Sequence, residues 1–397
     1  MADDAQATLR IVMEEIPDSH LVAALARDFE REHAGFDVQV DIMHYDFMLD
    51  LILGSIGESG PPNGIVIFDN PWTSDFSRGG LLRPIDDLLA DTPELGWDDF
   101  APALRDAAVL DGRTWGVPFY TWSFGLIYRT DLYRRAGLRP PRTLAELAGN
   151  AAALTTADRA GIAMQPKPDY NAAEEYANYL FAAGGSVQDA DERVVLDSPE
   201  ARTALEAYAD VYRSSAPAGT ENWTFEDSIA ALAEGRAAQM VNCHWWVPVL
   251  NDPNGPAGEL AGKFGLAPVP GGAGILGVWY WAIPAAAAQV DQAWTFIRWI
   301  ASKAANTERV GRGGSPVRIS TMTDPRVWER GYGREYYEAV NTIHQGARPL
   351  VSGPNAEEAI RALGEAVHGT ITGQIGVDDA VTRAALQVAE RLGAPAG

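Results

Sequence analysis

Aromatic residues stand beside polar ones at several points of the chain where a predicted strand ends or a loop begins. The clusters are Asp69-Asn70-Pro71-Trp72, Tyr120-Thr121-Trp122, Asp169-Tyr170, Asn242-Cys243-His244-Trp245-Trp246 and Trp279-Tyr280-Trp281. A sugar or polyol has C–H faces that pack on aromatic rings, and its hydroxyl groups need donors and acceptors in fixed directions. The clusters therefore favour the binding of a hydroxyl-rich molecule.

A second interpretation is that these aromatic side chains fill hydrophobic cores. We assign Trp97, Trp294 and Trp299 to structural positions, because helical or surface placement explains them. Alternation along a strand sends neighbouring residues of Trp279-Tyr280-Trp281 to opposite faces, so we expect one or two of them to reach a ligand. For Trp245 and Trp246, directly after a strand, we favour ligand contact.

Motifs of cofactor or metal chemistry are weak. Residues Gly272–Gly277 match GxGxxG, but a dinucleotide site needs a helix next, and the run from Val278 to Ile283 (VWYWAI) is typical of a strand. The six His residues are scattered and show neither HxxxH nor HExxH spacing. We expect no cofactor, no bound metal and no catalytic residue.

The charge balance excludes some partners. Lys and Arg number 31 against 54 Asp and Glu, which gives a net charge of −23. Such an acidic protein is repelled by phosphate backbones, so we expect no nucleic-acid partner. The single cysteine, Cys243, permits no internal disulfide, and the start Met1–Ala7 (MADDAQA) is not a signal peptide.

Alternating strand and helix patterns must position these residues. A strand over Thr8–Met13, a helix over His20–His33 and a strand over Phe36–Met43 predict a βαβ opening and hence an α/β fold. A helix over Tyr45–Gly54 and a turn at Gly60–Asn63 follow. The next buried strand, 64–68, is followed by Asp69, where open α/β sheets place their ligands.

The stretch Asp111–Leu147 organises the rest of the chain. Pro118 lacks a donor and should end a regular sheet, and the apolar run Phe119–Tyr128 suits a buried extended segment. We expect Thr130 to cap a helix that Gly137 ends, and Thr143 to form a capping box with Glu146. The pattern alone fits either one domain or a crossover between two lobes.

This stretch resembles the extracellular solute-binding proteins of ABC importers, in the carbohydrate-binding group that includes maltose-binding protein. That group shows D-G-K-x-Y-G-V-P, then L-x-Y-N-K-D-L, then A-G-L-x-x-P-x-T-W-x-E-L. The corresponding segments here are DGRTWGVP from Asp111, LIYRTDL from Leu126 and AGLRPPRTLAEL from Ala136. The departures are Trp115 for Tyr, Arg129-Thr130 for Asn-Lys, and Leu144 for Trp. Similar blocks elsewhere extend the resemblance over nearly the full length.

The resemblance implies a two-lobe periplasmic-binding-protein fold of type II, in which each lobe has a mixed, mostly parallel sheet flanked by helices. Three chain crossings are implied. We expect an N-terminal lobe of 1–121 and 271–318, a C-terminal lobe of 122–270 and 319–397, and hinges near 120–124, 265–270 and 317–321.

The function that the resemblance implies is binding without turnover: the lobes close on a carbohydrate or sugar alcohol in the cleft between them and deliver it to a membrane permease. A monomer is expected, in an extracytoplasmic location, with an initiator Met in place of the export signal. Arg318 is equally well explained as a hydroxyl donor or as a structural ion-pair partner, and Arg348-Pro349 fits a late family pair. The candidate ligand-binding residues are Glu14, Tyr45, Asp69, Asn70, Trp72, Tyr120, Asp169, Tyr170, Asn242, His244, Trp245, Trp246, Trp279, Tyr280, Arg318 and Arg348.

Two alternatives stay open. A carbohydrate-processing hydrolase needs two carboxylates about 5–9.5 Å apart, and the candidates are Glu14, Glu15, Asp69, Asp169 and Glu174. A cationic ligand such as a polyamine could also be held by acids and aromatic faces.

Overall fold

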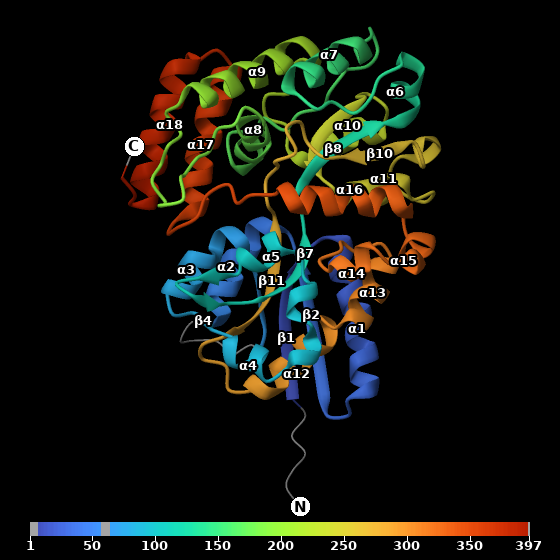
Figure 1. Ribbon diagram of the computed structural model, residues 1–397, viewed down its shortest axis with the longest axis vertical. Helices are drawn as coiled ribbons and strands as arrows, with labels where there is room; N and C mark the ends of the chain where they lie inside the picture. The colour runs from blue at the N-terminus through green and yellow to red at the C-terminus, as the bar shows by residue number, and fades with distance from the viewer. Residues whose placement is uncertain (1–6, 57–63, 396–397) are drawn as a thin grey trace, which may run out of the picture. The chain divides into compact units, whose positions relative to one another are not determined.

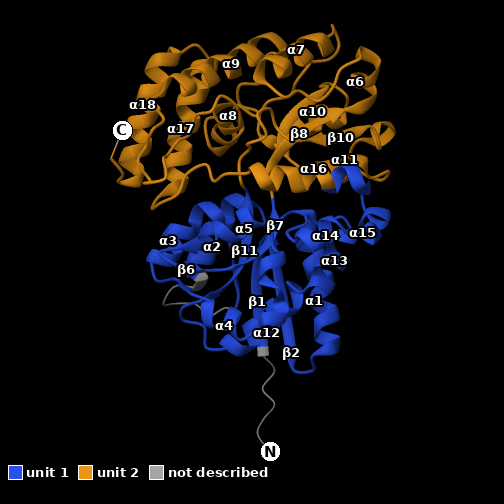
Figure 2. Ribbon diagram, viewed as in Figure 1, with its two compact units in different colours: residues 1–121, 277–337 blue, residues 122–276, 338–397 orange. Residues whose placement is uncertain are grey.

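The chain folds into two compact units in the computed structural model, which describes residues 7–56 and 64–395 (Figures 1 and 2). Unit 1 comprises Met1–Thr121 and Gly277–Tyr337, and unit 2 comprises Trp122–Leu276 and Glu338–Gly397. The predicted turn at Gly60–Asn63 lies outside the described residues, as does the start of the chain before Ala7.

The chain passes between the units after Thr121, Leu276 and Tyr337, whereas we expected boundaries after residues 121, 270 and 318. The expected second crossing, 265–270, overlaps strand β10 (Phe264–Ala267), which is paired inside unit 2. The expected third crossing, 317–321, is held inside unit 1, because Arg318 bonds to Asp99 and to the carbonyls of Leu95 and Ala301. Both boundaries therefore lie later in the chain than predicted.

Unit 1 is built on strand β11 (Val278–Pro284), whose residues are all buried. Strands β3 (Val66–Asp69), β4 (Leu82–Arg83) and β7 (Val117–Thr121) pair with it, all antiparallel. Strand β7 ends where the chain leaves the unit and β11 begins where it returns, so the two neighbours run in opposite directions. The other strands of the unit are β1 (Ala7–Glu14), parallel to β2 (Phe36–Met43), and the short hairpin of β5 (Val109–Leu110) and β6 (Arg113–Thr114).

Helix α1 covers the βαβ opening because its apolar residues recur on one face. It buries Val22, Leu25 and Phe29, and the Phe29 ring packs edge-on against Phe296 of α12 at 5.1 Å. The helices of unit 1 are α1 (Pro17–Glu32), α2 (Tyr45–Ile56), η1 (Asn70–Trp72), α3 (Thr73–Arg78), α4 (Asp86–Ala90), η2 (Pro93–Leu95), η3 (Trp97–Asp99), α5 (Pro102–Asp106), α12 (Val290–Ile300), α13 (Lys303–Gly311), α14 (Ile319–Met322) and α15 (Pro325–Arg330).

Unit 2 has a sheet in the order β10-β8-β9, with β8 (Phe124–Arg129) central and β9 (Gln239–Cys243) antiparallel to it. Parallel bridges from Ala160 and Ala163 extend the sheet beside β9. Among the described strands, then, the named ladders are antiparallel except β1 with β2, and the expected mostly parallel sheets are wrong. Antiparallel pairing arises in part because one strand leads out of a unit and its neighbour leads back in, as β7 and β11 do.

Helix α8 is the buried centre of unit 2 and lies beside α9 and α17 (Figure 1). It is enclosed because Ala172, Ala173 and Ala177 allow close approach while Tyr176 and Phe181 fill the core. The helices of this unit are α6 (Thr130–Ala136), α7 (Leu144–Leu154), α8 (Tyr170–Ala182), α9 (Pro199–Ser215), α10 (Phe225–Ala233), α11 (Trp246–Asn251), η4 (Gly258–Leu260), α17 (Ala356–Ile371) and α18 (Val377–Leu392), and α16 (Gly333–Gly346) spans the last boundary. No helix in the described ranges is both long and apolar enough to span a membrane.

Local predictions had mixed outcomes. Gly137 ends α6 with φ +67°, as predicted, but Thr130 does not cap that helix, because its hydroxyl donates to the Lys263 carbonyl. Thr143 caps α7 as predicted, whereas the Glu146 carboxylate accepts from the Arg142 backbone N–H rather than completing the capping box. Pro118 lies inside β7 instead of ending it, and the facing strand shifts register between Trp279 and Tyr280.

Candidate functional site

Six of the predicted residues come together in unit 1, where the sheet register joins segments far apart in the sequence. Trp279 of β11 is paired in register with both Asp69 of β3 and Tyr120 of β7. Asp69 accepts from the Asn70 backbone N–H at 2.9 Å and starts η1, which carries Trp72. We call this set the ring cluster; it comprises Glu14, Tyr45, Asn70, Trp72, Tyr120 and Trp279.

The rings of the cluster pack against one another with regular aromatic geometry. Trp72 stacks with Tyr45 at a centroid distance of 5.7 Å and meets Trp279 edge-on at 5.2 Å. Tyr120 lies nearly parallel to Trp279, with an interplanar angle of 10°. Trp72, Tyr120 and Trp279 are almost fully buried, while Tyr45 is half-buried. Tyr45 is therefore the ring of the cluster with the most exposed surface.

Polar contacts hold the ring cluster in place. The Tyr120 hydroxyl donates to Glu14 Oε2 at 2.7 Å, and Asn70 Oδ1 accepts from the Val278 backbone N–H at 3.0 Å. Behind Tyr120, the Ser315 hydroxyl bonds to both backbone groups of Thr121, which fixes the end of β7. Glu14 and Asn70 remain half-buried. They are the polar side chains that the cluster can offer to a ligand.

The second group lies in unit 2, where β9 ends and α11 begins. Trp245 and Trp246 stack with centroids 4.4 Å apart and an interplanar angle of 28°, and Phe225 lies 6.4 Å from Trp246. Trp245 is 9% exposed and Trp246 is half-buried. Within the part of the chain that the structure describes, neither indole N–H has a hydrogen-bond acceptor. We call these two residues the indole pair.

A buried polar network positions the chain around the indole pair. Asn242 Nδ2 donates to Gln165 Oε1 at 2.5 Å, and Gln165 Nε2 donates to the Asn171 carbonyl at 2.9 Å. The Asn171 side chain in turn donates to Asp169 and accepts from the Phe225 backbone N–H. The network thus links β9, the start of α8 and the start of α10. These hydrogen bonds therefore fix the positions of β9, α8 and α10 relative to one another.

Glu175 of α8 joins this network from the core. Its Oε2 accepts from the Gln165 backbone N–H at 2.9 Å and from the Tyr208 hydroxyl at 2.8 Å. Burial raises the pKa of the Glu175 carboxyl to about 8, although these two hydrogen bonds act in the opposite direction. The carboxyl is therefore protonated at neutral pH.

Three further candidates in unit 2 keep some access to solvent. Asp169 caps α8 and forms an ion pair with Lys167 at 2.9 Å, and Tyr170, the first residue of α8, is half-buried. The Arg348 guanidinium lies over the Phe181 ring at 4.3 Å, and burial lowers its pKa from the usual value. These residues stay candidates for polar contacts with a ligand.

Tyr280 and Arg318 are both enclosed by unit 1 and bonded within it. The Tyr280 hydroxyl donates to the Leu104 carbonyl at 2.9 Å, on the opposite face of β11 from Trp279. The Arg318 guanidinium stacks over the Phe100 ring at 3.9 Å. Its N–H groups donate hydrogen bonds to Asp99 and to backbone carbonyls. The structure thus contains the ion pair, with Asp99, that one of its two explanations requires.

Asn242 and His244 are also fully buried, and the contacts that the structure shows for them are with other side chains of unit 2. Asn242 belongs to the polar network, and the His244 ring lies 5.9 Å from the His344 ring. Both faces of β9 are covered, so all of its side chains are buried, and partial exposure begins only at Trp246, beyond the end of the strand. The residues that the sequence reasoning missed are the supports Gln165, Asn171 and Phe225, which no local pattern distinguishes from ordinary core and cap residues.

The polar clusters in the described ranges contain no group of three or more His, Cys, Asp or Glu arranged to hold a metal ion. The two groups instead combine aromatic faces with individual donors and acceptors. Such an arrangement suits reversible binding of a neutral polar molecule.

Comparison with known proteins identifies the family. The profile for the bacterial extracellular solute-binding proteins matches residues 14–307. The chain belongs to this family. A mannitol-binding protein from Pseudomonas aeruginosa is a solute-binding relative with 24% identity, covering 97% of this chain and 93% of its own.

Solved structures of solute-binding proteins align over nearly the whole chain. An ABC transporter solute-binding protein from Agrobacterium radiobacter, in complex with ribitol, is 26% identical over 98% of both chains, with a TM-score of 0.84. One from Agrobacterium vitis with bound D-mannitol is 22% identical, with 97% of this chain and 98% of its own covered and a TM-score of 0.80. These likenesses confirm the predicted two-lobe α/β fold class.

Proposed function

We propose that this solute-binding protein carries a sugar alcohol or a sugar for an ABC importer. The observation that carries the proposal is the indole pair: two stacked rings whose N–H groups have no acceptor in the described structure. A hydroxyl oxygen can accept from such donors while the C–H face beside it packs on a ring. The ring cluster of unit 1 supplies further aromatic surface, with Glu14 as an acceptor for hydroxyl protons.

A sugar alcohol is the first choice within this class. The relative from Pseudomonas aeruginosa is named for mannitol, and the two solved structures hold ribitol and mannitol. A linear polyol offers a hydroxyl at every carbon, so it needs donors and acceptors along its length. Trp246, Arg348 and Asp169 in unit 2, and Glu14 and Asn70 in unit 1, are of the types required.

We infer that the bound ligand is released chemically unchanged. A ligand shifts a conformational equilibrium only through its differential affinity for the two states, and a shift from 1:99 to 99:1 takes about 5.5 kcal/mol. Several stacked rings and hydrogen bonds at about 1 kcal/mol each are of the right size. The bound protein then delivers the ligand to a membrane permease outside the cytoplasm, acting as a monomer.

A ligand panel tests the proposal. Ribitol, mannitol, tagatose and maltose are added separately, and the apparent melting temperature and calorimetric affinity are measured. A ligand at 100 times its Kd stabilises the native state by about 2.7 kcal/mol, so the melting temperature should rise clearly for at least one of them. Mass spectrometry of the recovered ligand should show the starting mass. No stabilisation by any polyol or sugar, or recovery of a cleaved product, contradicts the proposal.

The salt dependence of ligand affinity distinguishes a polyol ligand from a polyamine ligand. A neutral ligand binds with nearly the same affinity at low and high ionic strength, whereas a cation held by acids binds more weakly as salt rises. Spermidine is the comparison ligand. Light scattering after size-exclusion chromatography, with and without the polyol, measures the molar mass and so tests whether the protein is a monomer.

A further inference from the structure

The last turn of α6 and the connection from α6 to α7 are unusually basic for this chain. Residues 134–142 (RRAGLRPPR) contain four arginines and no acidic residue, within a protein whose net charge is −23. Arg139 and Arg142 stand at positions that the family pattern A-G-L-x-x-P-x-T leaves open. The fold motif itself therefore does not require them.

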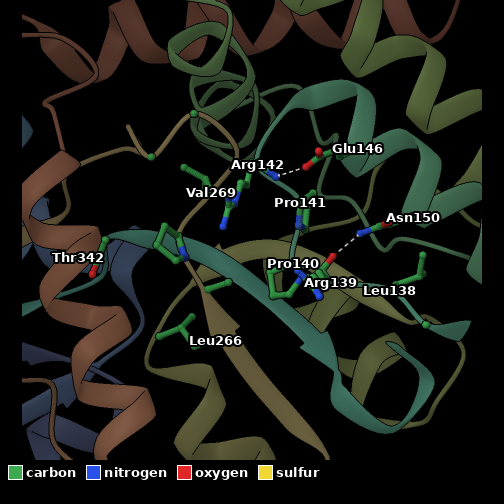
Figure 3. Close-up of a pocket in the computed structure, with 15 residues that line it drawn as sticks. Leu138, Arg139, Pro140, Pro141, Arg142, Glu146, Asn150, Leu266, Val269 and Thr342 are labelled. Carbon is green, nitrogen blue, oxygen red and sulfur yellow. Dashed lines mark hydrogen bonds between the residues drawn. The ribbon is translucent and has the colours of Figure 1, made fainter. Parts of the chain in front are cut away.

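Both arginines line a hollow in unit 2 with a volume of about 1030 Å³ (Figure 3). One wall is the α6–α7 connection, and the other is the end of β10 with the loop after it, joined by Thr342 of α16. The hollow shares no residue with the ring cluster or the indole pair. Its apolar surface comes from Leu138, Pro140, Pro141, Leu266, Ala267, Pro268 and Val269.

Hydrogen bonds fix the backbone that carries the two arginines. The Gly271 N–H donates to the Arg142 carbonyl at 3.0 Å, and the Arg142 N–H donates to the Glu146 carboxylate at 2.6 Å. The Arg139 carbonyl accepts from Asn150 Nδ2 of α7 at 2.9 Å. Figure 3 shows the Arg142 side chain entering the hollow between Val269 and Pro141. The Arg142 backbone is therefore held by Gly271 of the facing loop and by Glu146, and the Arg139 backbone is held by α7.

The two guanidinium groups have no carboxylate partner among the described residues, in contrast to many arginines of this chain. Arg129, Arg193 and Arg202, for example, each pair with an Asp of unit 2. Glu146 is the acidic residue of the lining, and its carboxylate is engaged with the Arg142 backbone. The lining consequently keeps a net positive charge in an acidic protein.

We propose that this hollow is a second binding site, for a small organic anion. A carboxylate or phosphate group binds Arg139 and Arg142, because a guanidinium offers parallel donors to two oxygens of either group. The apolar body of the same molecule packs on Leu138, Leu266 and Val269. The site stands independently of the polyol proposed above.

Calorimetric titration with three probes tests the site: cyclohexanecarboxylate, cyclohexylmethanol and inorganic phosphate. The carboxylate should bind saturably to the wild-type protein, phosphate more weakly and the neutral alcohol not measurably. Arg142→Gln should weaken carboxylate binding about tenfold, because it removes a charge-assisted pair of hydrogen bonds. Arg142→Lys keeps the charge and loses the planar fork, so its affinity should lie between the two.

The matched control is Arg134→Gln, which removes the same charge from the last turn of α6, next to the connection but outside the lining of the hollow. It should bind the carboxylate as the wild type does, and the melting temperatures of all variants should agree. Equal losses in R134Q and R142Q, equal binding of alcohol and carboxylate, or no saturable binding overturns the proposal. Displacement of the carboxylate by ribitol also overturns it, because the two ligands would then share one site.

Discussion

The ring cluster and the indole pair differ in how their polar atoms are used. In unit 1 the Tyr120 hydroxyl is bonded to Glu14, and Asn70 Oδ1 is bonded to the backbone of β11. In unit 2 the two indole N–H groups have no acceptor within the described ranges, although both nitrogen atoms are buried. In unit 1 these polar atoms are therefore already engaged within the unit, whereas unit 2 keeps two directed donors.

The difference follows from where each group stands in its fold. The ring cluster is assembled by sheet register from β3, β7 and β11, and close strands satisfy their neighbours' polar atoms. The indole pair lies beyond the end of β9, where the ladder stops and the side chains have no strand opposite. A buried donor without a partner costs free energy, which a ligand hydroxyl recovers on binding. Selectivity for hydroxyl groups should therefore reside mainly in unit 2.

The largest expected effect concerns the buried network that supports the indole pair. Folded protein keeps the proton on Glu175 up to about pH 8, whereas the unfolded chain loses it near the ordinary value of 4.5. Folding thus takes up a proton, and stability falls as pH rises through this window, by up to about 1.4 kcal/mol per pH unit. Glu175→Gln should flatten the dependence, as measured by urea unfolding at a series of pH values. The exposed Glu206→Gln on the next helix, α9, is the control, and an unchanged slope in E175Q contradicts the assignment.

The second-largest expected effect is on ligand affinity, when both the aromatic ring and the N–H donor of Trp246 are removed. Trp246→Ala removes a stacked face and an N–H donor from unit 2, so polyol affinity should fall about 100-fold, the equivalent of about 3 kcal/mol. Isothermal titration calorimetry measures it. Trp299→Ala is the matched control, because that indole is also half-buried but its N–H is bonded to Glu32. Similar losses in the two variants would mean a general structural effect.

A more conservative substitution at Trp246 tests the contribution of its indole N–H alone. Trp246→Phe keeps an aromatic ring and removes the N–H, so we expect a loss of about tenfold in polyol affinity. The same calorimetric titration, with circular dichroism to check the fold, is sufficient. If W246F binds as tightly as the wild type, the indole pair acts through its faces alone and the contrast between the units disappears.

The smallest effect is expected in unit 1. Tyr120→Phe keeps the ring against Trp279 and removes a hydroxyl already bonded to Glu14, so polyol affinity should change by less than about threefold. Unfolding stability should fall by about 1 kcal/mol for the lost hydrogen bond. A tenfold loss of affinity in Y120F would show that unit 1 also supplies a directed donor.

Much of the fold could be predicted because local rules act over short distances. The strand Phe36–Met43 matches its prediction, and Gly137 ends α6 as predicted. Strand direction could not be read in this way, because it depends on where the chain leaves and re-enters each unit. Pro118 shows the same limit: its tolerance inside β7 depends on a register shift in β11, more than 150 residues later.

The candidate site was predictable in its residue types and less so in its geometry. Composition identified the segments around Trp72, Tyr120, Trp246 and Trp279, and the structure joins three of these in one cluster. Contacts separated Trp279 from Tyr280: the Tyr280 hydroxyl donates to the Leu104 carbonyl, whereas the Trp279 ring packs on Trp72 and Tyr120. Alternation predicts opposite faces for the two residues but not which face holds the cluster. The supports Gln165 and Asn171 act through contacts distant in sequence, so no spacing rule could find them.

The only thiol in the sequence is also well placed as a chemical reporter. Cys243 is 9% exposed and lies two residues before Trp245, so its alkylation rate depends on opening at the end of β9. With no second cysteine to compete, a maleimide or iodoacetamide labels one known position, and mass spectrometry can time the reaction without any engineered variant. Slower labelling in the presence of solute would measure occupancy beside the two tryptophans, and a dye attached there would turn the native chain into a solute sensor.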